Sequence, residues 1–521
     1  MSRAATILRN VSSNWVGFAV NALVTLLLTP FVLRELGEAR YGVWILTSSV
    51  IGYYGFLDLG FRGGVTQYLT RYLAVRDHRR ANECLSSAVV AFSLFGAFLV
   101  FLSMGAAHVA PHVFNFPREL ESESFWCILI VGLSSAIQFT FFPFAAVFPA
   151  TQRFDLANLI GIGTRLLTAG GIFVALIKDY GLIGVSLATC GASLVDYLIR
   201  WRVALRLVPG LKISWRLARL DRLREIASFG AWNFLISVNT YAYEHMPAIL
   251  IGAFMPIAAV GHYALATGLL RSVNSVLSPV GRVLYPAAVE LHAMGDSDGL
   301  QRLYHKGSRL LILVMIPVVL TAMFWAEDFY RLWIGEKYLG GTDFHSVALL
   351  LQILLISTIT GHTSNIAAQV LSGSGYIRVL SIVLMGGSII NLTISLILIH
   401  YYGLAGVAAS TAIASIIVNF FIIPMLAQKL VSLSIKDFFC SACVRPVAVA
   451  VLLVVLMTCI RLAGKPSSWF DLIFQGVGAV MGSIVVVLGV GVTTDERHRF
   501  LVHPLARLRD KVRAGLEATG Y

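Results

Sequence analysis

The stretch Tyr41–Arg62, YGVWILTSSVIGYYGFLDLGFR, is apolar over a length that can cross a bilayer, and it carries an acid and a base near its end. Asp58 and Arg62 are four residues apart, so on a helix they share one face about one turn apart. Charges inside a span are costly and usually face a bundle interior or a water-filled cavity. Two interpretations stay open: a local ion pair near the headgroups, or a charged contact at a cavity within the membrane.

The composition of the whole chain is that of a polytopic membrane protein. Of the 521 residues, 57% are hydrophobic and 13% are charged, whereas a soluble domain carries about 25% charged residues. The net charge of +13 does not indicate nucleic-acid binding, because membrane proteins concentrate Lys and Arg in cytoplasmic loops. The six cysteines predict no disulfide framework. Cys440 and Cys443 form a CxxC motif without a second pair, so we expect neither a metal site nor a cofactor.

Hydropathy predicts an all-α fold with about fourteen transmembrane helices of about 20 residues each. An even number places both termini on one side, and that side is cytoplasmic because the basic segments 71–80, 200–224 and 497–513 then all face inward. The outer loops are short and leave no extramembrane domain for catalysis. The predicted spans are 11–33, 42–67, 84–108, 124–149, 158–177, 182–203, 227–251, 260–286, 307–326, 346–371, 379–400, 404–427, 444–463 and 471–493.

Two short motifs recur at nearly the same offset. Tyr180–Val185 reads YGLIGV and Tyr402–Val407 reads YGLAGV, 222 positions later. Gly42, near the start of the second span, similarly corresponds to Gly261, near the start of the eighth span and 219 positions later. Such a repeat predicts two six-helix lobes related by an axis along the membrane normal. The expected organisation is an N-lobe at 1–205, a cytoplasmic amphipathic connector at 206–226, a C-lobe at 227–430, two further helices at 431–493 and a basic cytoplasmic tail at 494–521.

The connector has the pattern of a surface helix. Ile213, Leu217, Leu220 and Leu223 recur at helical spacing, with arginines between them. A basic amphipathic helix of this kind is typical of attachment to an anionic inner leaflet. We therefore expect a helix that lies on the membrane surface between the two lobes.

Charged residues inside the spans are the candidate functional residues. Arg165 and Asp196 lie at similar depth in consecutive spans, which predicts a structural ion pair. Arg271 lies near the midplane of the eighth span, roughly 15 Å from its start, and such a residue is a functional candidate by default. Glu244 in the seventh span is a partial counter-charge. His245 beside it and His362 in the tenth span are each either a proton relay or hydrogen-bonded structure.

Arg62 and Arg282 occupy near-equivalent places in the two halves under the repeat. Facing arginines near the inner mouth would form a clamp, and guanidinium is well suited to bidentate contact with phosphate. The sequence therefore predicts an anionic substrate that carries a phosphate or pyrophosphate.

The chain resembles the polysaccharide-export flippases of the multidrug/oligosaccharidyl-lipid/polysaccharide (MOP) exporter superfamily, of the O-antigen type. The resemblance covers most of residues 1–430. It rests on the order of loose motifs: Asn14-Trp15, Leu36–Gly42 (LGEARYG), Leu57–Phe61 (LDLGF), Gln152-Arg153-Phe154 and the two YGLxGV stretches. The resemblance implies two lobes around a central cavity in the cell inner membrane. It also implies a lipid-linked oligosaccharide on undecaprenyl pyrophosphate as substrate, with the bilayer and polysaccharide assembly proteins as partners.

The resemblance also ranks the charged residues. The family's cavity is typically lined by spans one, two, seven and eight, which favours Arg62, Glu244, Arg271 and Arg282 and disfavours Arg165 and Asp196. It implies a structural role for Asp58. The first span carries no acid or base between Asn10 and Arg34, unlike related exporters that couple to cations through a first-span acid.

The predicted activity is transport of a lipid-linked oligosaccharide rather than an enzymatic reaction. No GxxxxGK[ST] motif is present in the sequence, so ATP is not the expected energy source. A lipid II flippase and a multidrug cation antiporter of the same superfamily are the alternatives. A membrane glycosyltransferase or O-antigen polymerase is less favoured, because the outer loops are too short to house catalytic residues.

Overall fold

The computed structural model describes residues 3–58, 61–282, 284–340, 344–434, 437–493 and 496, and within them every regular element is helical. Ten helical segments are long and apolar enough to cross a membrane. The prediction of an all-α polytopic membrane protein is therefore confirmed, whereas the count of fourteen spans and the cytoplasmic termini stay predictions. The predicted basic tail lies outside the described residues except for Glu496.

Two of the ten segments are long enough for two crossings. Ser12–Phe56 has 45 residues and Ile377–Val431 has 55, whereas about 20 residues span a bilayer. Each contains a glycine whose backbone leaves the helical region, Gly37 with φ 75° and Gly403 with φ 52°. Glycine adopts positive φ at little cost, so these are the points at which one predicted span gives way to the next.

The backbone repeats at the same offset as the sequence motifs. Gly181 and Gly403 follow the tyrosines of the two YGLxGV stretches, and their φ values are 54° and 52°. Helix breaks recur as well: α4 and α5 are separated at Ala146, and α13 and α14 at Ser364, 218 positions later. The two copies thus share local geometry, which supports the internal repeat.

The chain divides into two compact units whose boundaries differ from those of the predicted lobes. The first unit comprises Met1–Gly268, Gly341–His345 and Ser381–Ala414, and the second comprises Leu269–Gly340, Ser346–Leu380 and Ser415–Tyr521. The helices α9 (Ile257–Arg282) and α15 (Ile377–Ser415) therefore each contribute to both units. The lobes at 1–205 and 227–430 stay a prediction.

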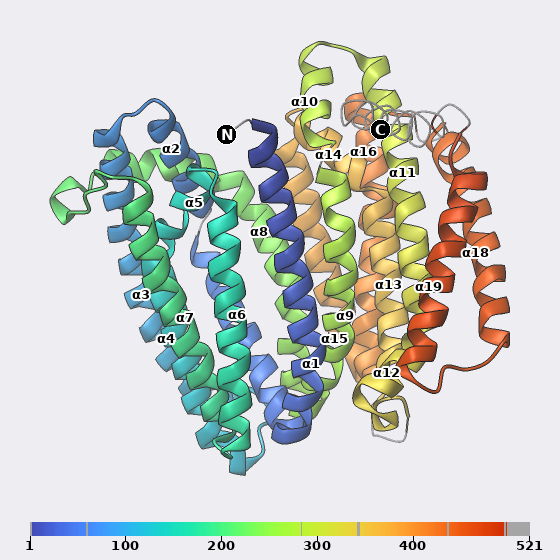
Figure 1. Cartoon of the computed structure of the whole chain (residues 1–521), viewed down its shortest axis with the longest axis horizontal. Coiled ribbons are helices and arrows are strands. Elements are labelled where there is room, and N and C mark those ends of the chain that lie inside the picture. Colours follow the sequence, from blue (N-terminus) through green and yellow to red (C-terminus); the bar gives the residue numbers. More distant parts are fainter. Residues whose placement is uncertain are drawn as a thin grey trace, which may run out of the picture. The chain divides into compact units, whose positions relative to one another are not determined.

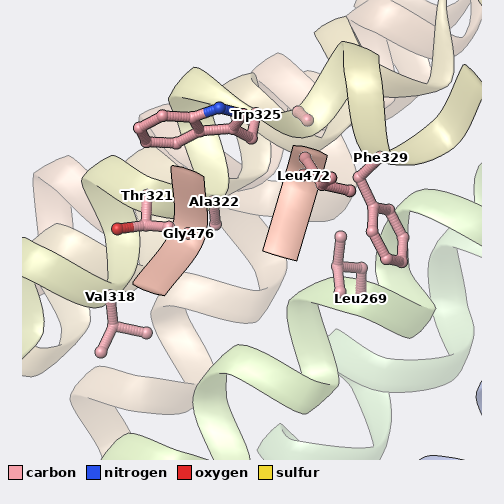
Figure 2. Close-up of a pocket in the computed structure, with 9 residues that line it drawn as sticks. Leu269, Val318, Thr321, Ala322, Trp325, Phe329, Leu472 and Gly476 are labelled. Atoms are coloured by element: carbon pink, nitrogen blue, oxygen red, sulfur yellow. The ribbon is translucent and has the colours of Figure 1, made fainter. Parts of the chain in front are cut away.

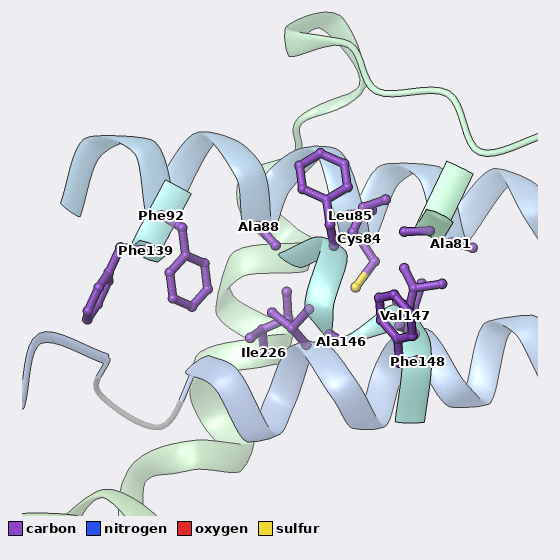
Figure 3. Packing of buried hydrophobic residues seen from close by; sticks show 14 of the residues in the cluster. Ala81, Cys84, Leu85, Ala88, Phe92, Phe139, Ala146, Val147, Phe148 and Ile226 are labelled. Carbon is purple, nitrogen blue, oxygen red and sulfur yellow. The ribbon is translucent and has the colours of Figure 1, made fainter. Parts of the chain in front are cut away.

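The first unit is built on aromatic and aliphatic side chains between α2, α3, α4, α5 and α8. Phe92, Val147 and Phe148 have no exposed surface, and Ile226 of α8 packs with them (Figure 3). Burial of each such side chain stabilises the fold by about 1.5–3 kcal/mol. The helices of this unit are α1 (Arg3–Gly52), α2 (Phe61–Ala74), α3 (His78–Val113), α4 (Glu121–Ala145), α5 (Val147–Ala150), α6 (Phe154–Ile177), α7 (Gly181–Leu207) and α8 (Leu220–Phe254), with the 3-10 turns η1 (Tyr53–Asp58), η2 (Arg118–Leu120) and η3 (Trp215–Leu217).

In the second unit, α18 and α19 lie side by side and pack against α11 (Figure 1). Arg461 of α18 pairs with the buried Asp328 at 3.3 Å, and the indole of Trp325 donates to Gln475 of α19 at 2.9 Å. The helices of this unit are α10 (Tyr285–Ala293), α11 (Ser297–Phe324), α12 (Ala326–Ile334), α13 (Val347–Thr363), α14 (Asn365–Gly373), α16 (Ile423–Val431), α18 (Val444–Leu462) and α19 (Trp469–Val486), with η4 (Glu336–Tyr338) and the π-helical stretches η5 (Ile416–Ile422), η6 (Phe438–Cys443) and η7 (Val487–Gly491).

The predicted surface helix of the connector is wrong. The helix α7 ends at Leu207 and α8 begins at Leu220, and the chain between them contains a single 3-10 turn. Asn82 of α3 donates to the carbonyl of Gly210 at 3.1 Å, and the amide of Arg219 donates to the hydroxyl of Ser87 at 2.8 Å. These hydrogen bonds hold the connector in an extended conformation on α3.

A buried acid explains why the connector lies on α3. The Glu83 side chain is 6% exposed and is 3.3 Å from Arg79, 3.6 Å from Arg219 and 3.4 Å from Arg222. Two of these arginines belong to the pattern that predicted attachment to lipid headgroups, and here a protein carboxylate attracts them instead. The hydrogen bond that Arg222 donates to Glu225 raises the pKa of Arg222.

Candidate functional site

Arg62 lies in the first turn of α2, which begins at Phe61. Its guanidinium carbon is 4.8 Å from the ring centre of Phe139 and 4.7 Å from that of Phe142, both on α4. Cation–π contacts of this kind hold a guanidinium in a fixed place. The side chain of Asp58 lies outside what the structure describes, so its predicted structural pairing is not tested.

Arg271 differs from Arg62 in its surroundings. Its side chain is exposed on α9, and within the described ranges it has neither an ion pair nor a hydrogen bond. The predicted partner in a clamp, Arg282, ends the same helix, and its side chain lies outside the described residues. The clamp formed by Arg62 and Arg282 therefore stays a prediction.

Glu244 and His245 are neighbours on α8 with different environments. Glu244 is exposed and has no ion pair or hydrogen bond among the residues that are described. The imidazole of His245 packs directly on Gly52, where a Cβ would have no room. It also stacks on Tyr241, with ring centres 6.1 Å apart and planes inclined by 16°.

His245 belongs to a group of four rings, the aromatic cluster, made of Tyr53, Phe56, Tyr241 and His245. Tyr53 and Phe56 come from η1, with ring centres 4.9 Å apart, and Phe56 lies 5.6 Å from Tyr241. The ring of Tyr241 occupies the space beside Gly55 as that of His245 does beside Gly52. The cluster thus locks α8 against the end of α1 within the first unit.

Arg165 and Asp196 do not form the predicted ion pair. Asp196 is paired with Arg200 one turn along α7 at 2.6 Å and accepts a hydrogen bond from Thr164 at 2.8 Å. Arg165 donates instead to the hydroxyl of Thr25 on α1 at 2.8 Å. Equal depth in the membrane did not imply contact, because Arg200, four residues along the same helix, supplies a nearer base.

The second unit contains buried polar side chains that the sequence analysis did not place together. Asn274 of α9, Thr358 and His362 of α13 and, in a neighbouring pair, Thr360 and Ser415 are joined by hydrogen bonds; we call these five residues the polar cluster. Thr358 and Ser415 are each 3% exposed. A signal was present in the sequence, because Asn274 comes one turn after Arg271.

An apolar groove runs along α11 and α19 in the second unit. One cavity of about 270 Å³ is lined by Leu269, Trp325, Phe329 and Leu472 among others (Figure 2). A second cavity of about 470 Å³ is lined by Leu313, Pro317 and residues of α19. Both cavities share Val318 and Thr321, so they adjoin one another. An apolar lining of this kind suits a hydrocarbon chain.

Comparisons with known proteins agree on the class. A family model described as a polysaccharide biosynthesis protein matches residues 34–342. The chain is 20% identical to a putative O-antigen transporter of Shigella flexneri over 423 residues, which are 79% of this chain and 96% of that protein.

Two solved structures share the fold. The lipid II flippase MurJ in an inward closed conformation matches with a TM-score of 0.66 and 14% identity, covering 90% of this chain and 97% of that one. An inward-facing multidrug resistance transporter of the MATE family, in the MOP superfamily, matches with a TM-score of 0.64 and 15% identity, covering 79% and 96%. These likenesses show the fold that the sequence resemblance implied.

Proposed function

The chain belongs to the polysaccharide biosynthesis protein family, and from this premise we propose that it is a flippase for a lipid-linked oligosaccharide. The substrate is carried on undecaprenyl pyrophosphate and moves from the inner to the outer leaflet of the cell inner membrane. The product serves polysaccharide or lipopolysaccharide export, and polysaccharide assembly proteins are the expected partners.

The main support for this proposal is the environment of Arg271. A guanidinium within a membrane helix is costly unless it faces water or a counter-charge. Arg271 is exposed and has no acidic partner in the described part of the chain. A pyrophosphate supplies the missing charge and matches the geometry of the guanidinium. Arg62 and Arg282 complete the proposed contact to the anionic head, with Glu244 and His245 as further cavity residues.

Alternating access is the proposed mechanism. The lobes at 1–205 and 227–430 rock about the pseudo-twofold axis, with fourteen spans and both termini in the cytoplasm. The matching backbone at Gly181 and Gly403 supports such symmetry. Asp58, Arg165 and Asp196 have a structural role in this scheme, with Asp196 paired with Arg200 and Arg165 hydrogen-bonded to Thr25.

The apolar groove supports a place for the lipid tail. The sugar head and pyrophosphate are hydrophilic and need the cavity, whereas a polyprenyl chain is stable against apolar side chains. The groove on α11 and α19 offers such a surface, because most of the side chains that line it are apolar. We propose that the tail lies along this groove while the head crosses.

A lipid II flippase is the second candidate, because lipid II has the same pyrophosphate-linked lipid chemistry and a solved lipid II flippase shares the fold over 90% of this chain. A cation antiporter requires acids in its cavity. Of the two acids that the sequence analysis placed within the seventh and sixth spans, Glu244 is exposed, whereas Asp196 is buried and paired with Arg200.

The test replaces Arg271 with alanine and separately with lysine, in cells in which surface polysaccharide can be measured. We expect Arg271→Ala to lower surface polysaccharide at least tenfold at an unchanged membrane level, because one oriented charged contact is worth about 1.5–3 kcal/mol. Arg271→Lys retains part of the activity. Normal surface polysaccharide in Arg271→Ala would contradict the assignment. Rescue of a lipid II flippase defect instead would favour the second candidate.

A further inference from the structure

The first half of α1 is exposed on two opposite sides. Val16, Leu23 and Leu27 are 55%, 56% and 66% exposed, and at 3.6 residues per turn they lie together on one side of the helix. An apolar side of this kind suits contact with lipid tails. Asn14 and Asn21 are exposed as well, and their spacing of seven residues places them together on the other side. The polar side of α1 therefore points away from the side that fits lipid.

The helix α6 packs beside α1 and fixes its rotation (Figure 1). The amide of Asn158 donates to the Oδ1 of Asn14 at 2.6 Å, and Arg165 donates to the hydroxyl of Thr25 at 2.8 Å. Thr25 follows Asn21 by four residues, so it lies on the same side of α1. These two hydrogen bonds, above and below Asn21, set the direction in which its side chain points.

The amide of Asn21 is itself unoccupied. It forms no hydrogen bond with any residue that the structure describes. The register of the contacts on either side places it level with Gly161–Gly163 of α6. A Cβ added at Gly163 would meet no atom within 4 Å, so there is free space beside α6 at this level. Asn21 can therefore accept a ligand without displacing a protein partner.

Asn21 also lies deep in the membrane. It is roughly 15 Å from the start of the predicted span at residue 11, which is near the middle of a hydrocarbon layer about 30 Å thick. An unsatisfied amide in contact with lipid at that depth costs several kcal/mol. Because the side of Leu23 fits lipid, the opposite side with Asn21 is the one that faces water or a polar ligand.

The hydrogen bonds that Asn21 offers are not accompanied by a free acid. The predicted span 11–33 contains no acid or base. The two charged residues of α6 are Asp155, which is paired with Arg153 at 3.0 Å, and Arg165, which is bonded to α1. A cation would therefore find no available carboxylate on either helix. A ligand with neutral hydrogen-bonding groups suits this side of α1 better.

We propose that Asn21, with Asn14 on the same side of α1, forms hydrogen bonds to the sugar hydroxyls of the lipid-linked oligosaccharide. A hydroxyl both donates and accepts, and a carboxamide presents donors on its nitrogen and an acceptor oxygen. The contact at Arg271 would recognise the pyrophosphate, which does not depend on the sugars, whereas Asn21 would respond to the sugars themselves. This inference rests on the proposed function, because it requires an oligosaccharide as substrate.

The first experiment measures which side of α1 is in contact with water. Asn21→Cys and Leu23→Cys are made in the full chain, and open membrane fragments are treated with a hydrophilic maleimide. Mass spectrometry of the peptide that contains the new cysteine separates it from the six native ones. We expect Asn21→Cys to react about tenfold faster or more, because the reactive thiolate forms in water and not in hydrocarbon.

Leu23→Cys is a matched control, because Leu23 is also exposed and lies at nearly the same depth on the opposite side of the helix. An equal or slower reaction of Asn21→Cys would overturn the proposal, since the amide would then face lipid or protein. This measurement needs neither substrate nor transport, so its outcome does not depend on the proposed function.

The second experiment measures surface polysaccharide in cells that carry Asn21→Leu, Asn21→Gln or Leu23→Ala at equal membrane levels. We expect a loss of about three- to tenfold in Asn21→Leu, the effect of removing about one hydrogen bond. Asn21→Gln keeps the amide and retains part of the activity, and Leu23→Ala behaves as wild type.

Normal surface polysaccharide in Asn21→Leu, or an equal loss in Leu23→Ala, would overturn the sugar contact. If Arg271→Ala lowers surface polysaccharide and Asn21→Leu does not, this inference fails and the proposed function stands. If Asn21→Leu lowers it and Arg271→Ala does not, the pyrophosphate contact fails and the sugar contact stands.

Discussion

Arg62 and Arg271 are both arginines of predicted spans, but their surroundings are opposite. Arg62 lies against two phenylalanine rings, close in sequence to the tightly packed aromatic cluster. Arg271 is exposed, and one turn away the chain presents hydrogen-bonding groups rather than rings. The first region is held by close packing of rings, whereas the second is held by hydrogen bonds between polar side chains.

The difference suggests a division of labour between the regions. A packed aromatic region keeps its geometry and is sensitive to added volume. A buried polar region depends instead on keeping each donor opposite an acceptor. Stability should therefore depend more on the surroundings of Arg62, and substrate binding more on those of Arg271.

The largest effect on stability is expected from Gly52→Val. The added side chain would enter the space that the ring of His245 occupies, and overpacking of this kind costs about 3 kcal/mol. The melting temperature in detergent and the amount of protein in membranes should both fall. Gly63→Val is the control, because a Cβ there meets no atom within 4 Å. Equal stability of the two variants would show that the aromatic cluster is not tightly packed.

A smaller effect is expected from Arg62→Ala. Loss of the contacts with Phe139 and Phe142 should lower the free energy of unfolding by about 1–2 kcal/mol. Arg271→Ala should leave the unfolding free energy within about 0.5 kcal/mol of the wild type, since it removes a surface side chain without a bonded partner. Thermal unfolding of both variants checks the contrast. A larger loss of stability in Arg271→Ala would reverse it.

The smallest measurable loss of stability is expected from Thr358→Val. This change removes one of the two donors to Asn274 and keeps the volume, so the cost should be about 1 kcal/mol. Thr458→Val is a suitable control, because Thr458 is exposed and bonds only to the carbonyl of Val454 on its own helix. If Thr358→Val were more damaging than Gly52→Val, the polar region would be the more rigid of the two.

The sequence was sufficient for the fold class and the repeat, because both depend on composition and spacing along the chain. Apolar segments of spanning length specify membrane helices directly. The two YGLxGV stretches predicted an internal repeat, and Gly181 and Gly403 have similar φ values. Such features need no knowledge of which helices are neighbours.

The wrong predictions concern features that depend on which helices pack against each other. The depth of Arg165 and Asp196 could be counted along each helix, but the direction of each side chain around the helix could not. The connector had the pattern of a surface helix, yet the buried Glu83 on a distant helix decided its conformation. The polar cluster brings together α9, α13 and η5, and its key break at Ser364 has no glycine or proline to mark it.

The attachment of α18 and α19 has a consequence for how such a chain can evolve. Asp328 is fully buried and pairs with both Arg331 of its own helix and Arg461 of α18, and Arg309 is paired with Glu496 beyond α19. Truncation before α18 would leave Asp328 with Arg331 alone and would leave Arg309 without its carboxylate in an apolar setting, which is costly. A shorter descendant should therefore also change residue 309, so loss of the two-helix extension is coupled to a substitution elsewhere in the chain.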